Sequence, residues 1–326
     1  MSLSIVMPVY NAAASLVAAV ASIQSQTFTE WELWLIDDGS TDDSSDLAND
    51  LAGEDSRIRV VQRPHEGIVS ALNHGLQLSQ GDYTARMDAD DVCYPTRFQK
   101  QIDYLKQNPD LGVVSCQVEF GGDSHKQKGY AAHVDWINST LRPEEHYANR
   151  FVDAPVAHPS VMWRRELPEK FGSYREGHFP EDFELWLRWM EQGLRFAKIA
   201  EPLMIWNDFP ERLSRKDDRY GIDAFYEIKC QYLKQTLPKD RPVWLWGAGR
   251  ISRKRFRGLK SLAGYVDVDS RKIGQKVEGL PVRSYHELPA NAFVLSGVAN
   301  RGVRNEIEAY LRSTGRQPVR DYYLCA

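Results

Sequence analysis

The segment Asp88-Ala89-Asp90-Asp91 places three carboxylates within four residues. It follows an apolar, strand-like segment, and side chains two residues apart in an extended chain point to the same side. Clustered carboxylates repel one another unless a cation lies between them, and oxygen ligands suit Mg²⁺ and Mn²⁺, which also bind diphosphate oxygens. The cluster is therefore a candidate divalent-metal site. The alternative is a solvated turn in which Asp91 helps to begin the helix near Pro95.

Two further acidic pairs stand where the local pattern changes. Asp37-Asp38 ends an apolar strand-like segment, and Glu181-Asp182 opens an amphipathic pattern that ends near Gly193. A carboxylate can accept the proton of an attacking hydroxyl, which is one chemical use for Asp182. Acidic residues are also favoured at a helix start by the helix dipole, so this pair has a purely structural explanation as well.

Strand and helix patterns alternate through the first 120 residues. Apolar segments predict strands at 4–9, 31–36, 58–61, 83–87 and 113–118, with helices between them, the first capped by Asn11. This alternation predicts a mostly parallel sheet, which binds ligands beyond the carboxyl ends of its strands, where both Asp clusters fall. Residues 121–143 are expected to be irregular, and 210–220 to form a polar, Arg-rich loop.

Length and composition narrow the class of protein. A chain of 326 residues holds one large domain or two ordinary ones. Its 42% hydrophobic and 26% charged residues are those of a globular protein. No apolar run approaches the roughly 18 residues that cross a bilayer. Four scattered cysteines and an N-terminus without a basic, apolar leader pattern lead us to expect a cytoplasmic protein.

Charge is unevenly distributed along the chain. From Lys239 to the end there are 17 Lys and Arg against 8 Asp and Glu, a balance of +9, whereas the first 238 residues have a balance of −13. A helix is predicted over 221–238 and leads to Pro238. We therefore expect a domain at 1–220, a linker helix at 221–238 and a second, basic domain at 239–326.

The basic domain begins with a strand, Gly247-Ala248-Gly249 and a helix, and Asp267 follows at the spacing of a ribose-binding carboxylate. This pattern resembles a Rossmann-like dinucleotide fingerprint. The third glycine position is Ser252, which puts close helix–strand packing in doubt. A structural or docking module is the favoured interpretation. The basic helix from Arg250 is either a solvated charged face or a contact for anionic lipid or a diphosphate-linked acceptor.

Four motifs, in this order, resemble those of glycosyltransferase family 2. They are Pro8-Val9-Tyr10-Asn11, Asp37-Asp38-Gly39-Ser40, Asp88-Ala89-Asp90-Asp91 and Glu181-Asp182-Phe183-Glu184. The resemblance covers about residues 3–220. It implies a metal-dependent, inverting enzyme with the GT-A nucleotide-sugar-binding fold, an α/β fold with a mostly parallel central sheet flanked by helices. The small C-terminal Rossmann-like α/β domain would be an addition to it.

The resemblance also implies roles for single residues at the donor site. Pro8, Tyr10 and Asp38 match the wall that holds the nucleotide base and ribose. Asp88 matches a residue that holds the ribose or donor sugar and is also a metal-ligand candidate, and Asp90 matches the metal ligand.

Further positions match the reacting end of the site. Asp182 matches the catalytic base. Asp91 is a secondary metal-ligand candidate, and Arg86 either contacts the donor or pairs with a nearby carboxylate. The segment expected to close over the diphosphate carries Arg212, Ser214 and Arg215.

The resulting hypothesis is transfer of a sugar from a nucleotide-diphosphate sugar, with UDP the commonest carrier, to a saccharide or lipid-linked acceptor in cell-surface polysaccharide synthesis. Mn²⁺ or Mg²⁺ would be the cofactor. A sugar-nucleotide pyrophosphorylase is one alternative, although residues 10–14 lack the basic loop it needs. A non-catalytic nucleotide-binding scaffold is the other. The hypothesis includes peripheral contact of the basic domain with the inner face of an anionic membrane, and no nucleic-acid partner.

Overall fold

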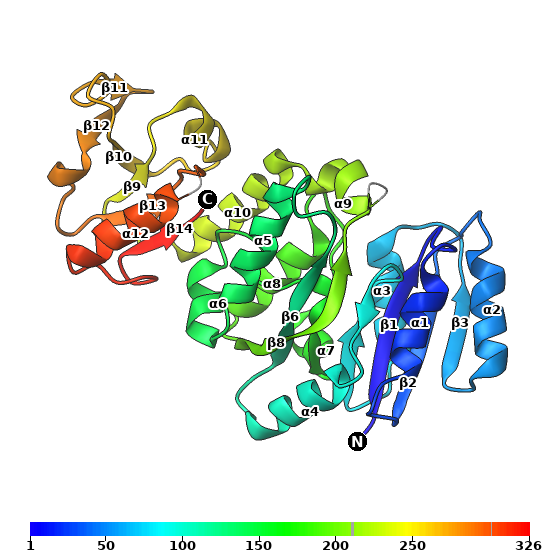
Figure 1. Ribbon diagram of the computed structural model, residues 1–326. Helices are drawn as coiled ribbons and strands as arrows, with labels where there is room; N and C mark the ends of the chain where they lie inside the picture. The colour runs from blue at the N-terminus through cyan, green and yellow to red at the C-terminus, as the bar shows by residue number, and fades with distance from the viewer. Residues whose placement is uncertain (210–211, 301) are drawn as a thin grey trace. The chain divides into compact units, whose positions relative to one another are not determined.

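The computed structural model describes residues 1–209, 212–300 and 302–326, which form two compact units (Figure 1). Unit 1 comprises Met1–Tyr147, Pro155–Gly177 and Glu184–Lys216. Unit 2 comprises Ala148–Ala154, His178–Phe183 and Asp217–Ala326. Each unit is built on its own β-sheet.

The sheet of unit 1 has the strand order β3-β2-β1-β4-β7-β6-β8-β5. Strands β1 to β4 are parallel to one another, and β8 is parallel to β6. The short strands β5 and β7 run antiparallel to their neighbours. The strands are β1 Leu3–Val9, β2 Trp31–Asp37, β3 Ile58–Gln62, β4 Tyr83–Arg86, β5 Val92–Cys93, β6 Val113–Gly121, β7 Met162–Arg164 and β8 Phe196–Asn207. The predicted mostly parallel α/β sheet is confirmed.

Helices cover both faces of this sheet, because alternate residues of a strand point to opposite faces. Ile5 and Met7 of β1 pack in one core with Leu16 and Val20 of α1. Val6 points the other way, to Gly75 of α3. The helices are α1 Leu16–Gln24, α2 Ser44–Glu54, α3 Ile68–Leu78, α4 Arg97–Gln107, α5 Lys128–Ser139, α6 Pro143–Asn149, α7 Leu167–Phe171, α8 Glu181–Glu191 and α9 Leu213–Lys216, with a 3-10 turn η1 at His158–Ser160.

The five predicted strands of unit 1 all form, but three other expectations were wrong. Asn11 does not cap α1, which begins at Leu16; its Oδ1 accepts the Thr41 N–H at 2.8 Å instead. Residues 121–143 are not irregular, because they contain the helix α5. Apolar residues of α5 are buried in the hydrophobic core against other elements. The segment 210–220 contains α9 and a 3-10 turn, η2, at Asp218–Tyr220, while its residues 210 and 211 lie outside the described residues.

Unit 2 has the strand order β11-β12-β10-β9-β13-β14, and all its pairs except β11 with β12 are parallel. Order along the sheet reverses between β9 and β13, as in Rossmann-like folds. The strands are β9 Val243–Trp246, β10 Leu262–Asp267, β11 Lys276–Val277, β12 Leu280–Ser284, β13 Phe293–Ser296 and β14 Tyr322–Leu324; the helical segments are α10 Ile222–Thr236, α11 Arg250–Arg255, η3 Tyr285–Glu287 and α12 Val303–Ser313. This part of the chain therefore has a second, mostly parallel sheet of its own, and its Rossmann-like character stays a prediction.

The glycine turn of unit 2 packs closely although its third glycine is replaced. Gly247 has φ +117°, and a Cβ there would lie 2.7 Å from Ser252 Oγ. The Ser252 hydroxyl donates to the Gly297 carbonyl at 2.9 Å, so its hydroxyl is satisfied while buried. Serine therefore replaces the glycine by hydrogen bonding to the neighbouring loop, and the doubt about close packing was wrong.

Candidate active site

The Asp cluster lies just beyond the carboxyl end of β4. The strand β4 neighbours β1, and the order of strands along the sheet reverses between these two. This is the position at which open α/β sheets bind ligands. One oxygen from each of Asp88, Asp90 and Asp91 lies within 4.8 Å of the others. The sheet therefore brings the three carboxylates to one point, as the sequence predicted.

Burial and mutual repulsion make this cluster costly in the absence of a cation. Burial, followed by the charge of Asp88, raises the pKa of Asp90 to about 6. The pKa of Asp91, which is 1% exposed, is raised well above its usual range by burial and by the charges of Asp88 and Asp90. A cation among the three would relieve the repulsion.

The surroundings of Asp91 fit a metal ligand better than a helix cap. Its Oδ1 accepts the Asn207 N–H at 2.8 Å, while Oδ2 is buried and has no hydrogen-bond partner among the described residues. A buried carboxylate oxygen is normally paired or bound to a metal. The helix α4 starts only at Arg97 and has no side-chain cap. The donor set, all carboxylate oxygens, suits Mg²⁺ or Mn²⁺.

Arg86 is paired with the cluster itself. Its guanidinium is 3% exposed and forms an ion pair with Asp88. Burial by itself lowers the pKa of Arg86, but the charge and hydrogen bond of Asp88, together with the charges of Tyr174 and Asp91, raise that pKa above its ordinary value. Of the two roles left open for Arg86, the structure shows pairing with a carboxylate. Asp88 is thereby held beside a permanent positive charge.

A buried aromatic pair in the same unit was not anticipated. The His158 Nε2 lies 2.6 Å from the Tyr174 hydroxyl. Burial, then the charge of Arg86, lowers the pKa of His158 well below its usual range. Tyr174 also exchanges backbone hydrogen bonds with the Asn73 side chain. A neutral histidine in this setting is structural.

Among the three residues expected to close over the diphosphate, Arg212 is the one whose charge acts on the carboxylates of the Asp cluster. It donates to the Tyr130 hydroxyl at 2.7 Å and to the Asn207 carbonyl at 3.0 Å. Its charge lowers the pKa values of Asp90 and Asp91 against the effect of burial. Tyr130 was missed because it lies on α5, in the segment expected to be irregular.

The other two members of that segment have different surroundings. Arg215 pairs with the buried Asp208, with its Nε 3.2 Å from Oδ1. Ser214 is exposed on α9. The structure therefore brings Arg212 to the carboxylates and leaves Arg215 engaged elsewhere in unit 1.

The expected base and ribose wall lies at the carboxyl ends of β1 and β2. Pro8 is in β1 beside Ile36. The Asp38 carboxylate is buried and accepts the N–H groups of Glu66 and Gly67 at 3.0 and 2.9 Å. Asp38 therefore orders the loop that follows β3.

Tyr10 stands at the rim of this wall with an unexpected neighbour. Its side chain is 48% exposed, and its ring stacks on His65 with the centroids 4.2 Å apart. The His65 Nδ1 is 2.9 Å from the Asp38 carbonyl oxygen. His65 was missed because the polar loop that carries it has no periodic pattern.

Asp182 belongs to unit 2, as the second residue of α8. Its Oδ1 accepts the N–H of Phe183 at 2.7 Å. The neighbouring Glu181 accepts the Tyr220 hydroxyl at 2.6 Å, and burial followed by the Glu181 charge raises the pKa of Tyr220. Asp182 is thus at a helix start, as its structural explanation predicted, and its role as the catalytic base stays a prediction.

Asp267, the carboxylate expected to bind the ribose of a dinucleotide, is instead hydrogen-bonded to groups of the protein. Asp267 accepts the N–H groups of Ala248 and Asp269 at 3.0 and 2.9 Å, and Lys272 Nζ lies 3.0 Å away. A ribose would have to displace these donors. The surroundings of Asp267 fit a local structural role and do not fit a preformed dinucleotide site.

The chain belongs to glycosyl transferase family 2: the family model with this description matches residues 4–171. EpsE of Bacillus subtilis (strain 168), named as a glycosyltransferase, is 30% identical over 288 residues, which cover 85% of this chain and 96% of EpsE. WbnJ of Escherichia coli, named as an O-antigen biosynthesis glycosyltransferase, is 28% identical over 245 residues, covering 73% of this chain and 89% of WbnJ.

Solved structures show the same fold at low identity. TarS of S. aureus, residues 1–349 in complex with UDP-GlcNAc, has a TM-score of 0.56 at 15% identity, covering 74% of this chain and 68% of that one. The mannosyltransferase PcManGT of Pyrobaculum calidifontis, in complex with GDP-Man and Mn²⁺, has a TM-score of 0.52 at 20% identity, covering 72% and 62%. The protein is therefore a glycosyltransferase with a GT-A fold, and the pyrophosphorylase and scaffold alternatives are not supported.

None of the helices in the described part of the chain is both long and apolar enough to cross a membrane.

Proposed function

We propose that this glycosyltransferase transfers one sugar, with inversion, from a nucleotide-diphosphate sugar to a saccharide or lipid-linked acceptor in cell-surface polysaccharide synthesis. The observation that carries the proposal is the convergence of Asp88, Asp90 and Asp91 beyond β4, where the strand order reverses. WbnJ is named for O-antigen biosynthesis, which supports the acceptor class. TarS was solved with UDP-GlcNAc, and UDP is the proposed carrier.

The proposed metal ligands are Asp90 and Asp91, for Mn²⁺ or Mg²⁺. Asp88, held by Arg86, would face the ribose or donor sugar. When bound, the cation would stabilise the charge that develops on the leaving diphosphate. Mn²⁺ accompanies GDP-Man in the PcManGT structure, which supports this choice of ion.

Guanidinium groups would assist at the diphosphate. Their planar donor pattern matches phosphate oxygens. Arg212 is already within electrostatic reach of the carboxylates. Arg215 would first exchange Asp208 for the diphosphate, and its guanidinium is partly exposed. Ser214 lies between the two in sequence, on the short helix α9 that also carries Arg215.

In the proposed reaction, the acceptor hydroxyl oxygen forms a bond to the anomeric carbon as the bond from that carbon to the diphosphate oxygen breaks. The electron pair of the broken bond leaves with the nucleoside diphosphate. The hydroxyl proton passes to the Asp182 carboxylate. One displacement of this kind inverts the anomeric configuration.

The donor nucleotide would lie along Pro8, Tyr10 and Asp38. The exposed ring of Tyr10, backed by His65, offers a flat face on which a base can stack. The Asp38 carboxylate is hydrogen-bonded to the loop after β3. Asp38 would therefore help to bind the nucleotide by ordering that loop.

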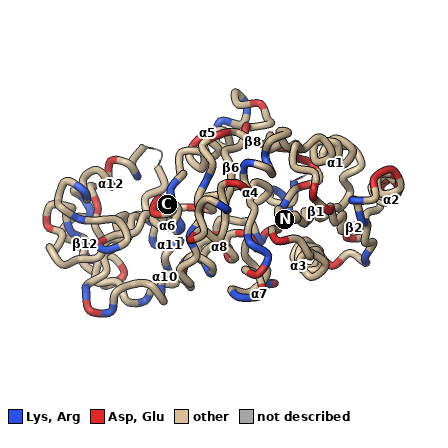
Figure 2. The backbone as a smooth tube through the Cα atoms, turned by 90° about the horizontal axis from the view of Figure 1, so that it is seen from below, with Lys and Arg blue, Asp and Glu red and all other residues tan. Residues whose placement is uncertain are grey.

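The domain assignment stays a proposal: a catalytic domain at 1–220, a linker helix at 221–238 and a Rossmann-like domain at 239–326. The last of these, with its balance of +9, would make the peripheral contact with an anionic membrane. Figure 2 shows blue Lys and Arg positions along this part of the chain.

A thermal-shift screen of UDP-, GDP- and dTDP-sugars, with and without Mn²⁺, tests the proposal. A donor that binds the folded state should raise the melting temperature in a Mn²⁺-dependent way. Asp90→Ala should abolish that dependence and lower turnover by about a hundredfold or more. Asp182→Asn should keep the shift and lose turnover by about a hundredfold or more, because only proton transfer is removed.

Asp103→Asn is the matched control, since Asp103 is a partly exposed carboxylate of α4 that pairs with Lys106 and accepts the Gln99 amide N–H at 2.8 Å. It should leave both the shift and turnover unchanged. Full turnover by Asp90→Ala would overturn the metal assignment, and full turnover by Asp182→Asn would overturn the base.

A further inference from the structure

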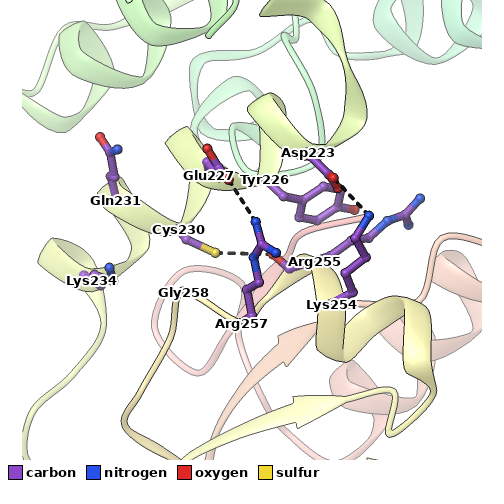
Figure 3. Close-up of a pocket in the computed structure, with 10 residues that line it drawn as sticks. All are labelled: Asp223, Tyr226, Glu227, Cys230, Gln231, Lys234, Lys254, Arg255, Arg257 and Gly258. Atoms are coloured by element: carbon purple, nitrogen blue, oxygen red, sulfur yellow. Dashed lines mark hydrogen bonds and ion pairs between the residues drawn. The ribbon is translucent and has the colours of Figure 1, made fainter. Parts of the chain in front are cut away.

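A pocket of about 260 Å³ opens within unit 2, between α10 and the segment that contains α11 and the residues after it (Figure 3). Its volume is below the roughly 300 Å³ at which drug-sized ligands begin to fit, so it suits a small group. Four of its lining side chains are cationic and two are anionic; they are Lys234, Lys254, Arg255 and Arg257, with Asp223 and Glu227.

Two of these cations bridge the pocket to α10, as the dashed lines of Figure 3 show. Lys254 Nζ is 2.9 Å from Asp223, and an Arg257 Nη is 3.1 Å from Glu227. All four side chains are 55–62% exposed. Ion pairs this exposed contribute little to stability, so a multiply charged anion can replace the carboxylates.

The other two cations have no close carboxylate partner among the described residues, although the charge of Arg255 contributes to lowering the pKa of Asp223. Within the described residues, neither Lys234 nor Arg255 forms an ion pair with a carboxylate. The Arg255 guanidinium instead lies over the Tyr226 ring, 4.9 Å from its centroid. The lining thus has an excess of two positive charges, which complements a phosphate or diphosphate group.

The backbone that carries Arg255 and Arg257 is held in place by the packing of Phe256 and Gly258 against α10. Phe256 is buried and meets the Tyr226 ring edge-on, with the centroids 5.3 Å apart. A Cβ at Gly258 would lie 3.0 Å from the Cys230 Cβ, so the chain passes close to α10 there. Arg255 and Arg257 therefore flank a fixed anchor, and binding would cost less ordering entropy than at a mobile loop.

We propose that this pocket is an anion site that binds a phosphate or diphosphate group, carried by a lipid or free in solution. Guanidinium and ammonium groups on both sides of the pocket match the several oxygens of such a group. The site uses none of the residues assigned to sugar transfer. Binding of a lipid-carried group would deepen the proposed membrane contact of residues 239–326 and rests on it, whereas binding of a soluble phosphate or diphosphate does not.

Calorimetric titration of the full chain with sodium pyrophosphate, in a chelator that removes metals, is the direct test. Lys234→Glu should weaken binding by about tenfold or more, because it reverses an unpaired charge of the lining. It should leave the melting temperature unchanged, because Lys234 forms no ion pair with any residue that the structure describes. Lys234→Gln should weaken binding less. Lys239→Glu, an exposed lysine outside the lining, should bind like the unaltered chain.

Flotation with phosphatidylcholine vesicles, with and without phosphatidic acid, separates the two sources of the group. Phosphatidic-acid-dependent flotation that Lys234→Glu abolishes and pyrophosphate competes away would identify a lipid headgroup. Pyrophosphate binding without flotation would identify a soluble ligand. No pyrophosphate binding by the unaltered chain, or equal binding by Lys234→Glu, would overturn the proposal.

Discussion

Each carboxylate of the Asp cluster has a different environment, although the three are adjacent in sequence. Asp88 is paired with Arg86, whereas Asp91 has one oxygen hydrogen-bonded to the Asn207 N–H and one without a partner among the described residues. The Asn207 side chain also donates to the Asp90 carbonyl at 2.7 Å. Asn207, at the end of β8, therefore positions two of the three. These differences support assigning Asp90 and Asp91 to the metal and Asp88 to the donor.

At the scale of single residues, the burial of Lys229 predicts how the stability of the protein depends on pH. It is fully buried in unit 2, where its Nζ donates to the carbonyls of Cys325 and Val152 at 2.9 and 3.1 Å. Burial lowers its pKa from 10.5 to about 8. Between these values the unfolded chain binds a proton that the folded chain does not, so stability rises with pH across this window.

The prediction compares the free energy of unfolding of the unaltered chain with that of Lys229→Met. The free energy of unfolding of the unaltered chain, relative to that of Lys229→Met, should increase by about 2 kcal/mol between about pH 8 and about pH 10. Chemical denaturation at each pH measures it. The exposed Lys239→Met is the control and should show no such trend. A difference that stays constant with pH would mean that Lys229 is not desolvated as the structure indicates.

At the scale of elements, the contact of α3 with β1 and β2 depends on a residue without a side chain. A Cβ at Gly75 would lie 2.4 Å from Val6 Cγ1 and 3.3 Å from Ile36 Cγ1. Because Val6 is buried in the central strand, the added methyl would force the helix away from the sheet. Gly75→Ala should lower the free energy of unfolding by about 1–3 kcal/mol, measured by chemical denaturation.

Gly53 is the matched control for this substitution. It is an exposed glycine of α2 with no atom within 4 Å of a Cβ placed there. Gly53→Ala should raise stability by about 0.5–1 kcal/mol, because alanine restricts the unfolded chain and favours the helix. Equal stability of Gly75→Ala and the unaltered chain would show that the helix can shift without cost.

At the scale of the whole molecule, unit 2 includes two short segments from the first 183 residues of the chain. Phe151 is fully buried, and its ring centroid is 5.1 Å from that of Tyr323. Lys229 links the carbonyls of Val152 and Cys325. A chain that ends at Pro238 would lack half of each contact and expose the Phe151 side chain.

That shortened chain should melt at a lower temperature than the full chain and bind a hydrophobic dye, because apolar surface of the 148–154 segment loses its cover. Thermal unfolding with the dye measures both effects. Cooperative unfolding at an unchanged temperature would show instead that residues 1–238 fold independently, in support of a boundary at Pro238.

Local pattern determined much of this protein. The strands of the first 120 residues and the helix predicted over 221–238, which forms at Ile222–Thr236, followed from periodicity. The spacing of apolar residues along a strand or an amphipathic helix shows which of its faces is buried. The order of the four motifs indicated the family. One of these motifs is the Asp cluster, which lies where a strand of the sheet ends.

Only the tertiary structure decided the rest, because it depends on groups far apart in the chain. The α5 helix lacks a strong pattern of its own, yet its Tyr130 receives a hydrogen bond from Arg212. The pairing of Asp91 with Asn207 joins residues 116 positions apart. The assignment of residues 148–154 to unit 2 likewise rests on contacts with the end of the chain, for which no local periodicity is a guide.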